Sequence, residues 1–160
     1  LYVWGGFYQN GKSSVVATSG LRYLLQGKCW NSLPAPRNGE GKELTLTGAT
    51  AMLAVGPDGE AQIICAGGVN HDIFWDAISG TYSKVAQADY LKKDISWYQF
   101  NGCPLTYKLK TERWEILSHQ TSLLARAGAQ VAMRKHTLYY IGGELKPGLR
   151  SPGIVQLDLR

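Results

Sequence analysis

The sequence predicts an all-β domain in which short antiparallel strands recur along the chain. Nineteen glycines and six prolines among 160 residues give a density of turn-forming residues that suits many short strands better than a few long helices. Charged residues make up only 18% of the chain and hydrophobic residues 44%, so a long disordered segment is not expected. An apolar run that ends in a pair of glycines occurs three times, which indicates a structural repeat.

The glycine pairs mark the end of one strand in each repeat. The three runs cover residues 1–6, 63–68 and 138–143. An additional strand is expected before the second and third runs, at 48–55 and 128–133, and the turns at 57–59 and 134–136 join it to the run as a hairpin. The second and third repeats therefore each begin with two paired strands.

Two further strands follow each glycine pair. The third strand is expected at 21–25, 105–109 and 154–159, and the fourth, which is built on a tryptophan, at 29–33 and 113–117. Each repeat is thus a four-stranded antiparallel meander. Because such a unit cannot bury both of its faces alone, several units must pack radially, as the blades of a β-propeller do.

This order of features resembles the kelch repeat, in which a glycine pair closes the second strand, an aromatic residue lies near the third and a tryptophan lies in the fourth. An unrelated β-sandwich with chance glycine pairs is the alternative. Kelch propellers usually have six or seven blades of about 50 residues. The resemblance therefore implies about half of a probable six-bladed ring: an incomplete blade at 1–36, a complete blade at 45–118 and an incomplete blade at 126–160. The remaining blades are expected on the parent chain or on another chain.

One helical insertion is expected at about 71–103, between the second and third strands of the middle repeat. Its apolar residues recur at helical spacing, with charged residues at 92–94 on the other side. The positions that set this spacing are Val85, Ala88, Leu91, Ile95 and Tyr98. The expected helix either docks against the side of the propeller or takes part in a site.

Charge, cysteine and histidine usage exclude several functions. The formal net charge is +5, but the basic residues are scattered, so no nucleic-acid partner is expected. No apolar run approaches the roughly 18 residues that a membrane helix needs. The three cysteines form no CxxC pair, and His71, His119 and His136 lack the spacing of metal ligands. We therefore expect no metal, no organic cofactor and no copper-oxidase chemistry.

Candidate site residues gather in the loops that follow each second strand or precede each first strand, because these loops open on one face of the sheets. They are Asn70, His71, Arg126, Glu144 and Arg150. A mouth lined by such side chains suits a polar, acidic small molecule. Asn70 either binds a sugar hydroxyl or caps a turn, and His71 either relays a proton or is structural. Arg126 either binds an acidic ligand or bridges two blades.

The segment 141–150 carries the most information about chemistry. Its Pro147-Gly148 turn places Glu144 and Arg150 on two arms that can converge on one ligand. A glycine directly before Glu144 lets the backbone pass close to a ligand. The alternative is a surface salt bridge between the two side chains.

The motif Gly-Gly-Glu-x-Lys-Pro-Gly-Leu-Arg at 142–150, together with Gly-Gly-Val-Asn-His-Asp-Ile-Phe at 67–74, resembles the bacterial N-acetylneuraminate epimerases. These are kelch-type sialic acid mutarotases, and the likeness is strongest to the branch called cyclically permuted mutarotases. The resemblance implies that Glu144 is the proton acceptor and that Arg150 holds the substrate. It also implies an isomerase that interconverts the α and β anomers of sialic acid in the periplasm. The alternative function is a kelch module that binds a protein or a glycan without catalysis.

Overall fold

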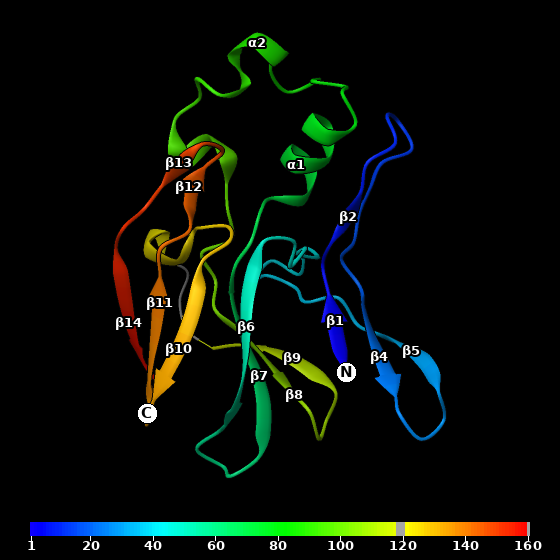
Figure 1. Ribbon diagram of the computed structural model, residues 1–160, viewed down its shortest axis with the longest axis vertical. Helices are drawn as coiled ribbons and strands as arrows, with labels where there is room; N and C mark the ends of the chain where they lie inside the picture. Colours follow the sequence, from blue (N-terminus) through cyan, green and yellow to red (C-terminus); the bar gives the residue numbers. More distant parts are fainter. Residues whose placement is uncertain (118–120, 160) are drawn as a thin grey trace.

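The computed structural model describes residues 1–117 and 121–159. It consists of antiparallel β-sheets, and the two α-helices between residues 71 and 90 lie above one end of them (Figure 1). The predicted all-β fold is confirmed. Among the described residues, no helix combines the length and apolar character that crossing a membrane requires.

The first sheet has the order β1-β4-β5, with every pairing antiparallel. A small hairpin of β2 and β3 extends from it between β1 and β4. The bounds are β1 (Tyr2–Trp4), β2 (Phe7–Tyr8), β3 (Val15–Val16), β4 (Gly20–Leu24) and β5 (Cys29–Leu33).

The middle sheet is a complete meander with the order β6-β7-β8-β9. Its strands are β6 (Ala49–Val55), β7 (Ala61–Gly67), β8 (Leu105–Lys108) and β9 (Arg113–Ile116). The chain between β7 and β8 forms the insertion, with α1 (His71–Ile78), α2 (Gln87–Tyr90) and the 3-10 helix η1 (Ile95–Tyr98).

The third sheet has the order β10-β11-β14, and a hairpin of β12 and β13 extends from it between β11 and β14. The 3-10 helix η2 (Ser122–Leu124) precedes it. The bounds are β10 (Gln130–Arg134), β11 (Thr137–Ile141), β12 (Glu144–Lys146), β13 (Leu149–Arg150) and β14 (Ile154–Asp158).

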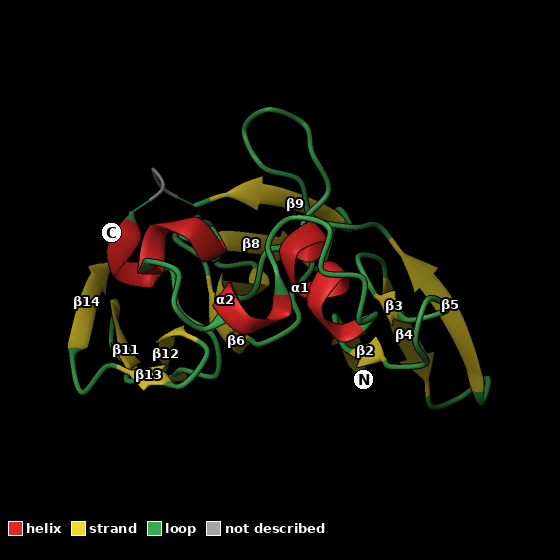
Figure 2. Ribbon diagram, turned by 90° about the horizontal axis from the view of Figure 1, so that it is seen from above, coloured by secondary structure: helices red, strands yellow, loops and turns green. Residues whose placement is uncertain are grey.

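The three sheets lie in an arc when seen from above, with β6 on the inner side of the middle sheet and β9 on its outer side (Figure 2). A core of buried apolar residues fills the space between the middle and third sheets; it includes Ile64, Ala66, Leu124, Leu138 and Tyr140. This burial is the main force that holds the two sheets together.

Aromatic residues join the first and middle sheets. The indole rings of Trp4 and Trp114 meet edge to face, with centroids 5.1 Å apart. Both Nε1 atoms donate to the carbonyl oxygen of Pro34, at 3.1 and 3.0 Å. Trp114, the tryptophan of the fourth strand in the middle repeat, therefore helps to hold the first sheet in place beside the middle sheet.

Each glycine pair ends its strand by turning the chain toward the same end of the molecule. All six glycines have positive φ, and Gly67, at +78°, shows why glycine is needed. A Cβ on Gly67 would lie 2.2 Å from Tyr140 Oη and 2.4 Å from the carbonyl oxygen of Arg126. An L-residue would thus meet both backbone strain and a clash.

The insertion differs from the single amphipathic helix that the spacing over 85–98 predicts. The longest helix is α1, whose first turn is capped by Asn70, while 85–98 is broken into α2 and η1. Leu91 and Ile95 are 62% and 43% exposed, and Tyr98 is the buried member of the predicted stripe. Without a continuous surface to pack on, the apolar spacing does not sustain one helix.

Candidate functional site

The segments that follow the three glycine pairs meet at one end of the molecule, where β2, α1, α2 and β12 gather in Figure 1. We call these segments the first, second and third excursions; they are the β2–β3 hairpin, the insertion and the β12–β13 hairpin. On one side, Trp75 Nε1 of α1 donates to the carbonyl oxygen of Ser14 at 2.7 Å, beside the β2–β3 hairpin. The rings of Phe7 and Phe74 meet edge to face at 5.0 Å. The insertion is therefore packed against the excursion of the first sheet.

Lys146 of β12 ties the other side of the insertion to the third sheet. Its Nζ donates to the carbonyl oxygens of Lys93 at 2.6 Å and of Leu91 at 3.2 Å. These two carbonyls lie just after α2, where a cation is favourable. Lys146 belongs to the motif at 142–150, but sequence reasoning assigned it no role.

A cavity of about 400 Å³ lies where the three excursions meet, and we call it the aromatic cavity. Gln9 reaches it from the first excursion, and Glu144 and Pro147 reach it from the third. The insertion supplies most of the wall, through Asn70, Ile73, Phe74, Ala77, Ile78, Tyr82, Tyr90, Tyr98 and Phe100. Its volume falls in the range of small-molecule sites, which are mainly apolar with a few polar groups.

Glu144 is, within residues 1–117 and 121–159, the one carboxylate that lines this cavity. Its strand is held against Ala127 by two backbone hydrogen bonds, with N–O distances of 2.7 and 3.0 Å. Gly143 makes this approach possible, because a Cβ there would lie 2.9 Å from the Cβ of Ala129. The carboxylate is thereby placed at the cavity on a regular, well-bonded strand.

Arg150 lies opposite Glu144 across the β12–β13 hairpin, as the Pro147-Gly148 turn predicts. Its Nε is 3.6 Å from Glu144 Oε1, so the pair forms the surface ion pair that the sequence left open as an alternative. The Arg150 side chain is 84% exposed and does not line the aromatic cavity. Its guanidinium is therefore accessible to a ligand that approaches Glu144 from solvent.

Two tyrosines of the cavity wall, Tyr90 and Tyr98, have a raised pKa. Burial, followed by the neighbouring tyrosines Tyr98 and Tyr82, raises the pKa of Tyr90 to about 12. Burial also raises the pKa of Tyr98, whose hydroxyl donates to the carbonyl oxygen of Tyr90. The raised pKa keeps both phenols protonated at neutral pH.

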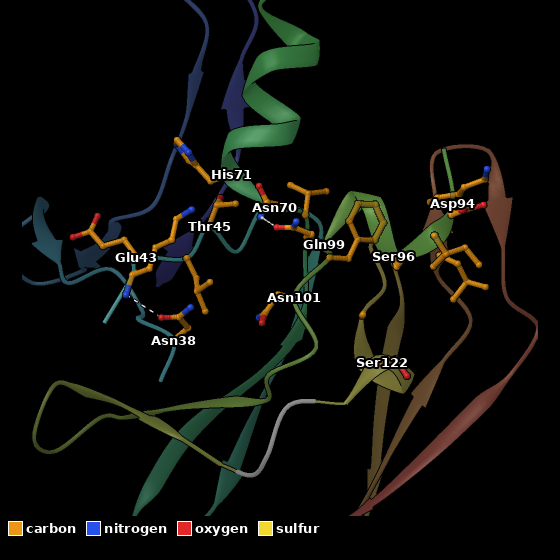
Figure 3. A pocket seen from close by; sticks show the side chains of 18 of the residues that line it. Asn38, Glu43, Thr45, Asn70, His71, Asp94, Ser96, Gln99, Asn101 and Ser122 are labelled. Carbon is orange, nitrogen blue, oxygen red and sulfur yellow. Dashed lines mark hydrogen bonds between the residues drawn. The ribbon is translucent and has the colours of Figure 1, made fainter. Parts of the chain in front are cut away.

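Asn70 is the N-cap of α1, which corresponds to its structural alternative. Its Oδ1 accepts from the backbone N of Ile73 at 3.1 Å, and its Nδ2 donates to Gln99 Oε1 at 3.4 Å. The residue also lines the aromatic cavity and a neighbouring larger cleft of about 1130 Å³ (Figure 3). Its side-chain amide therefore has a structural role, because Oδ1 caps α1 and Nδ2 is bonded to Gln99.

His71 lines the larger cleft, whereas Glu144 does not (Figure 3). Its Nδ1 lies 2.8 Å from Asp72 Oδ1, and Lys42 Nζ lies 2.8 Å from Asp72 Oδ2. The hydrogen bonds from Lys42 and then from His71 lower the pKa of Asp72 to about 2. The structure thus places His71 beside Glu144's cavity rather than in it, with Asn70 between the two.

Arg126 is buried, at 5% exposure, in contacts that fit its role as a bridge between blades. Its Nη1 donates to the carbonyl oxygens of Gly142 at 2.8 Å and of Gly153 at 2.9 Å. Its own carbonyl oxygen accepts from the backbone N of Gly68 at 2.8 Å. One residue therefore connects the glycine pairs of the middle and third sheets, and this geometry favours the structural alternative over a substrate contact.

Asp76 is a buried carboxylate that sequence reasoning missed. It accepts from the backbone N and the Oγ of Ser83, at 2.9 and 2.7 Å, and from the backbone N of Lys84 at 3.0 Å. Burial opposes ionisation, but these hydrogen bonds outweigh it and lower the pKa of Asp76. The carboxylate fixes the turn that carries Tyr82 into the cavity wall.

Among the described residues, we find no group of three or more His, Cys, Asp or Glu side chains that could hold a metal ion. Two of the three histidines are placed by the structure, and His119 lies outside the described residues. The apolar wall of the aromatic cavity supplies aromatic rings and one carboxylate rather than a set of ligands.

Three antiparallel sheets that pack face to face in an arc define a section of a β-propeller. Over 99% of its length the chain superimposes on the solved "Structure of YjhT", with a TM-score of 0.77, 25% sequence identity and coverage of 46% of that chain. The family model for N-acetylneuraminate epimerase matches residues 1–160. The chain therefore belongs to the N-acetylneuraminate epimerase family.

Curated relatives carry the same family name. The N-acetylneuraminate epimerase of Yersinia enterocolitica serotype O:8 is 29% identical, over 98% of this chain and 40% of that protein. The N-acetylneuraminate epimerase of Escherichia coli O9:H4 is 28% identical, over 99% of this chain and 42% of that protein. The chain thus spans about two fifths of the length of these relatives.

Proposed function

We propose that this chain supplies part of the active site of an N-acetylneuraminate epimerase, with Glu144 as the general base. The observation that carries the proposal is the position of Glu144, a carboxylate on the wall of an aromatic cavity, in a chain of this family. The reaction is the interconversion of the α and β anomers of sialic acid. The enzyme is accordingly an isomerase.

Glu144 starts the reaction by taking the proton of the anomeric hydroxyl. The bond between the anomeric carbon and the ring oxygen then breaks, and the ring oxygen takes up a proton to give the open keto form. Reclosure on the opposite face of the carbonyl reverses both proton transfers and yields the other anomer. General-base assistance of this kind contributes about 10²–10⁴ in rate, which suits a reaction that also proceeds unaided.

Arg150 binds the carboxylate of the substrate in this proposal. Its guanidinium presents a planar fork that matches a carboxylate at two points. The side chain is 84% exposed, so it can reach a ligand with little desolvation. Its ion pair with Glu144 also keeps the two groups on one side of the hairpin.

The complete ring is also part of the proposal. The chain covers about two fifths of its relatives, so we expect the remaining blades on the parent chain or on another chain. One face of the first sheet supports this, since it exposes Leu1, Val3, Leu21 and Trp30 by 69%, 43%, 46% and 51%. Such an apolar surface is suited to packing against another blade. By family resemblance we place the enzyme in the periplasm.

The decisive experiment follows the conversion of α-N-acetylneuraminate to the β anomer by proton NMR, with the intact protein that contains this chain. Glu144→Gln keeps the shape of the cavity and removes the base, so the exchange rate should fall toward the uncatalysed rate while binding survives. Arg150→Lys should raise KM more than it lowers kcat, because a two-point contact becomes one. Unchanged exchange with Glu144→Gln would refute the assignment of the base.

A further inference from the structure

We propose that the aromatic cavity beside Glu144 binds the N-acyl group of the substrate, and that the α1 wall of this cavity sets the largest acyl group accepted. This inference rests on the proposed function and adds a substrate specificity to it. The juxtaposition that supports it is a carboxylate that shares one cavity with five aromatic rings.

The chemistry of the wall selects for an apolar substituent. Apart from Gln9, Asn70 and Glu144, the lining residues are aliphatic or aromatic, or the ring of Pro147. The substituents on the ring of a sialic acid are hydroxyl groups, a carboxylate, a polyhydroxylated side chain and the acylamino group, and the alkyl part of the acyl group is the apolar one among them. Among these substituents, the alkyl group is the one whose transfer from water to such a wall lowers the free energy.

The position of Glu144 agrees with this assignment. The acylamino carbon lies across the six-membered ring from the anomeric carbon, so the acyl group points away from the reacting hydroxyl. A sugar whose anomeric hydroxyl meets Glu144 at the β12 edge can therefore extend its acyl group toward the insertion. Gln9 lines the same cavity and offers an amide that can bond the polar amide of the acyl substituent.

The volume of the cavity exceeds what an acetyl group fills. At about 400 Å³ the space can take longer alkyl chains, and each buried methylene is worth about fourfold in affinity. We therefore expect acyl groups longer than acetyl to be accepted. The largest acyl group accepted is the one whose alkyl chain just reaches α1, which lines the cavity with Ile73, Ala77 and Ile78.

The α1 wall is well fixed, which is what a selective boundary needs. Asp76, next to Ala77, is 4% exposed and holds Ser83 and Lys84 through three hydrogen bonds. Trp75, which precedes Asp76 in α1, donates a hydrogen bond to the carbonyl oxygen of Ser14 beside the β2–β3 hairpin. Because α1 is held on both sides, a side chain added at Ala77 will narrow the cavity rather than displace the helix.

The test measures kcat/KM for anomer exchange, by proton NMR on the intact protein, with N-acetyl-, N-propanoyl- and N-butanoylneuraminate. Ala77→Leu should lower the ratio of N-butanoyl to N-acetyl activity by at least tenfold, and Ile78→Ala should raise it severalfold. Ala88→Leu is the matched control, because Ala88 lies on α2, is exposed and does not line the cavity. It should leave the ratio unchanged.

The outcomes separate this inference from the function on which it rests. If the wild-type protein exchanges N-acetylneuraminate but the ratio is the same in all three variants, the acyl assignment is overturned and the epimerase proposal stands. If Ala77→Leu does not fold, Ile78→Ala still decides through the opposite change. No acceleration of any analogue by the wild-type protein would overturn the epimerase proposal, and the acyl assignment with it.

Discussion

Replacement of Arg126 by methionine distinguishes a structural arginine from a substrate-binding one. Methionine keeps much of the apolar stem against the ring of Tyr140, which lies 5.8 Å from the guanidinium carbon. It removes the two hydrogen bonds to Gly142 and Gly153. Hydrogen bonds from a charged donor contribute about 1.5–3 kcal/mol each.

The expected loss is smaller than the sum of the two bonds. Burying a guanidinium has a desolvation cost, and Arg126 Nε is buried without a hydrogen-bond partner. Removing the group recovers part of that cost. We therefore expect Arg126→Met to lower the free energy of unfolding by about 3 kcal/mol, while KM of the protein that remains folded changes little.

Urea unfolding of the intact protein measures the first quantity, and anomer exchange measured by NMR gives the second. Arg150→Met is the matched control, since its side chain is 84% exposed and an exposed ion pair contributes about 0.5 kcal/mol or less. The reasoning would be refuted if Arg126→Met unfolded at the wild-type urea concentration but raised KM. That result would return Arg126 to the substrate site.

Two further predictions concern the ends of the excursions. Gly67→Ala should destabilise far more than Gly6→Ala: both positions have positive φ, which costs about 1–2 kcal/mol, but a Cβ clashes only at Gly67. Thermal unfolding measures the difference, and equal losses would contradict the clash. Lys146→Met should speed amide hydrogen exchange at 91–98, because two carbonyl contacts are lost. Lys92→Met is the control, because the Lys92 side chain is 71% exposed. Wild-type protection of these amides in Lys146→Met would contradict the role of Lys146 in holding the insertion.

The strands were predictable because their signals are local. A glycine pair, a short turn and an alternating apolar run each act within a few residues, so the pairing of β6 with β7 and of β10 with β11 follows from the sequence. The Pro147-Gly148 turn, which sets Glu144 opposite Arg150, is local in the same way.

The insertion and two of the site residues depended on distant contacts. The spacing over 85–98 suggests a helix, but no continuous surface is present to bury Leu91 and Ile95. The burial of Arg126 requires the third sheet, whose carbonyls come from residues up to 27 positions away. Glu144 directly follows a glycine pair and His71 comes three positions after one, yet His71 is the first residue of α1 and lines the neighbouring cleft. None of these outcomes is encoded in a short window.

The glycine pairs separate the regular part of this fold from the variable part. After one pair the chain makes a hairpin of two very short strands, after the next it makes the whole insertion from 68 to 104, and after the last it makes the hairpin that carries Glu144. The pairing of the strands before and after each excursion stays antiparallel whatever its length. Evolution can thus lengthen, shorten or exchange any one of these segments, and so remodel what the molecule recognises, without redesigning the sheets that support it.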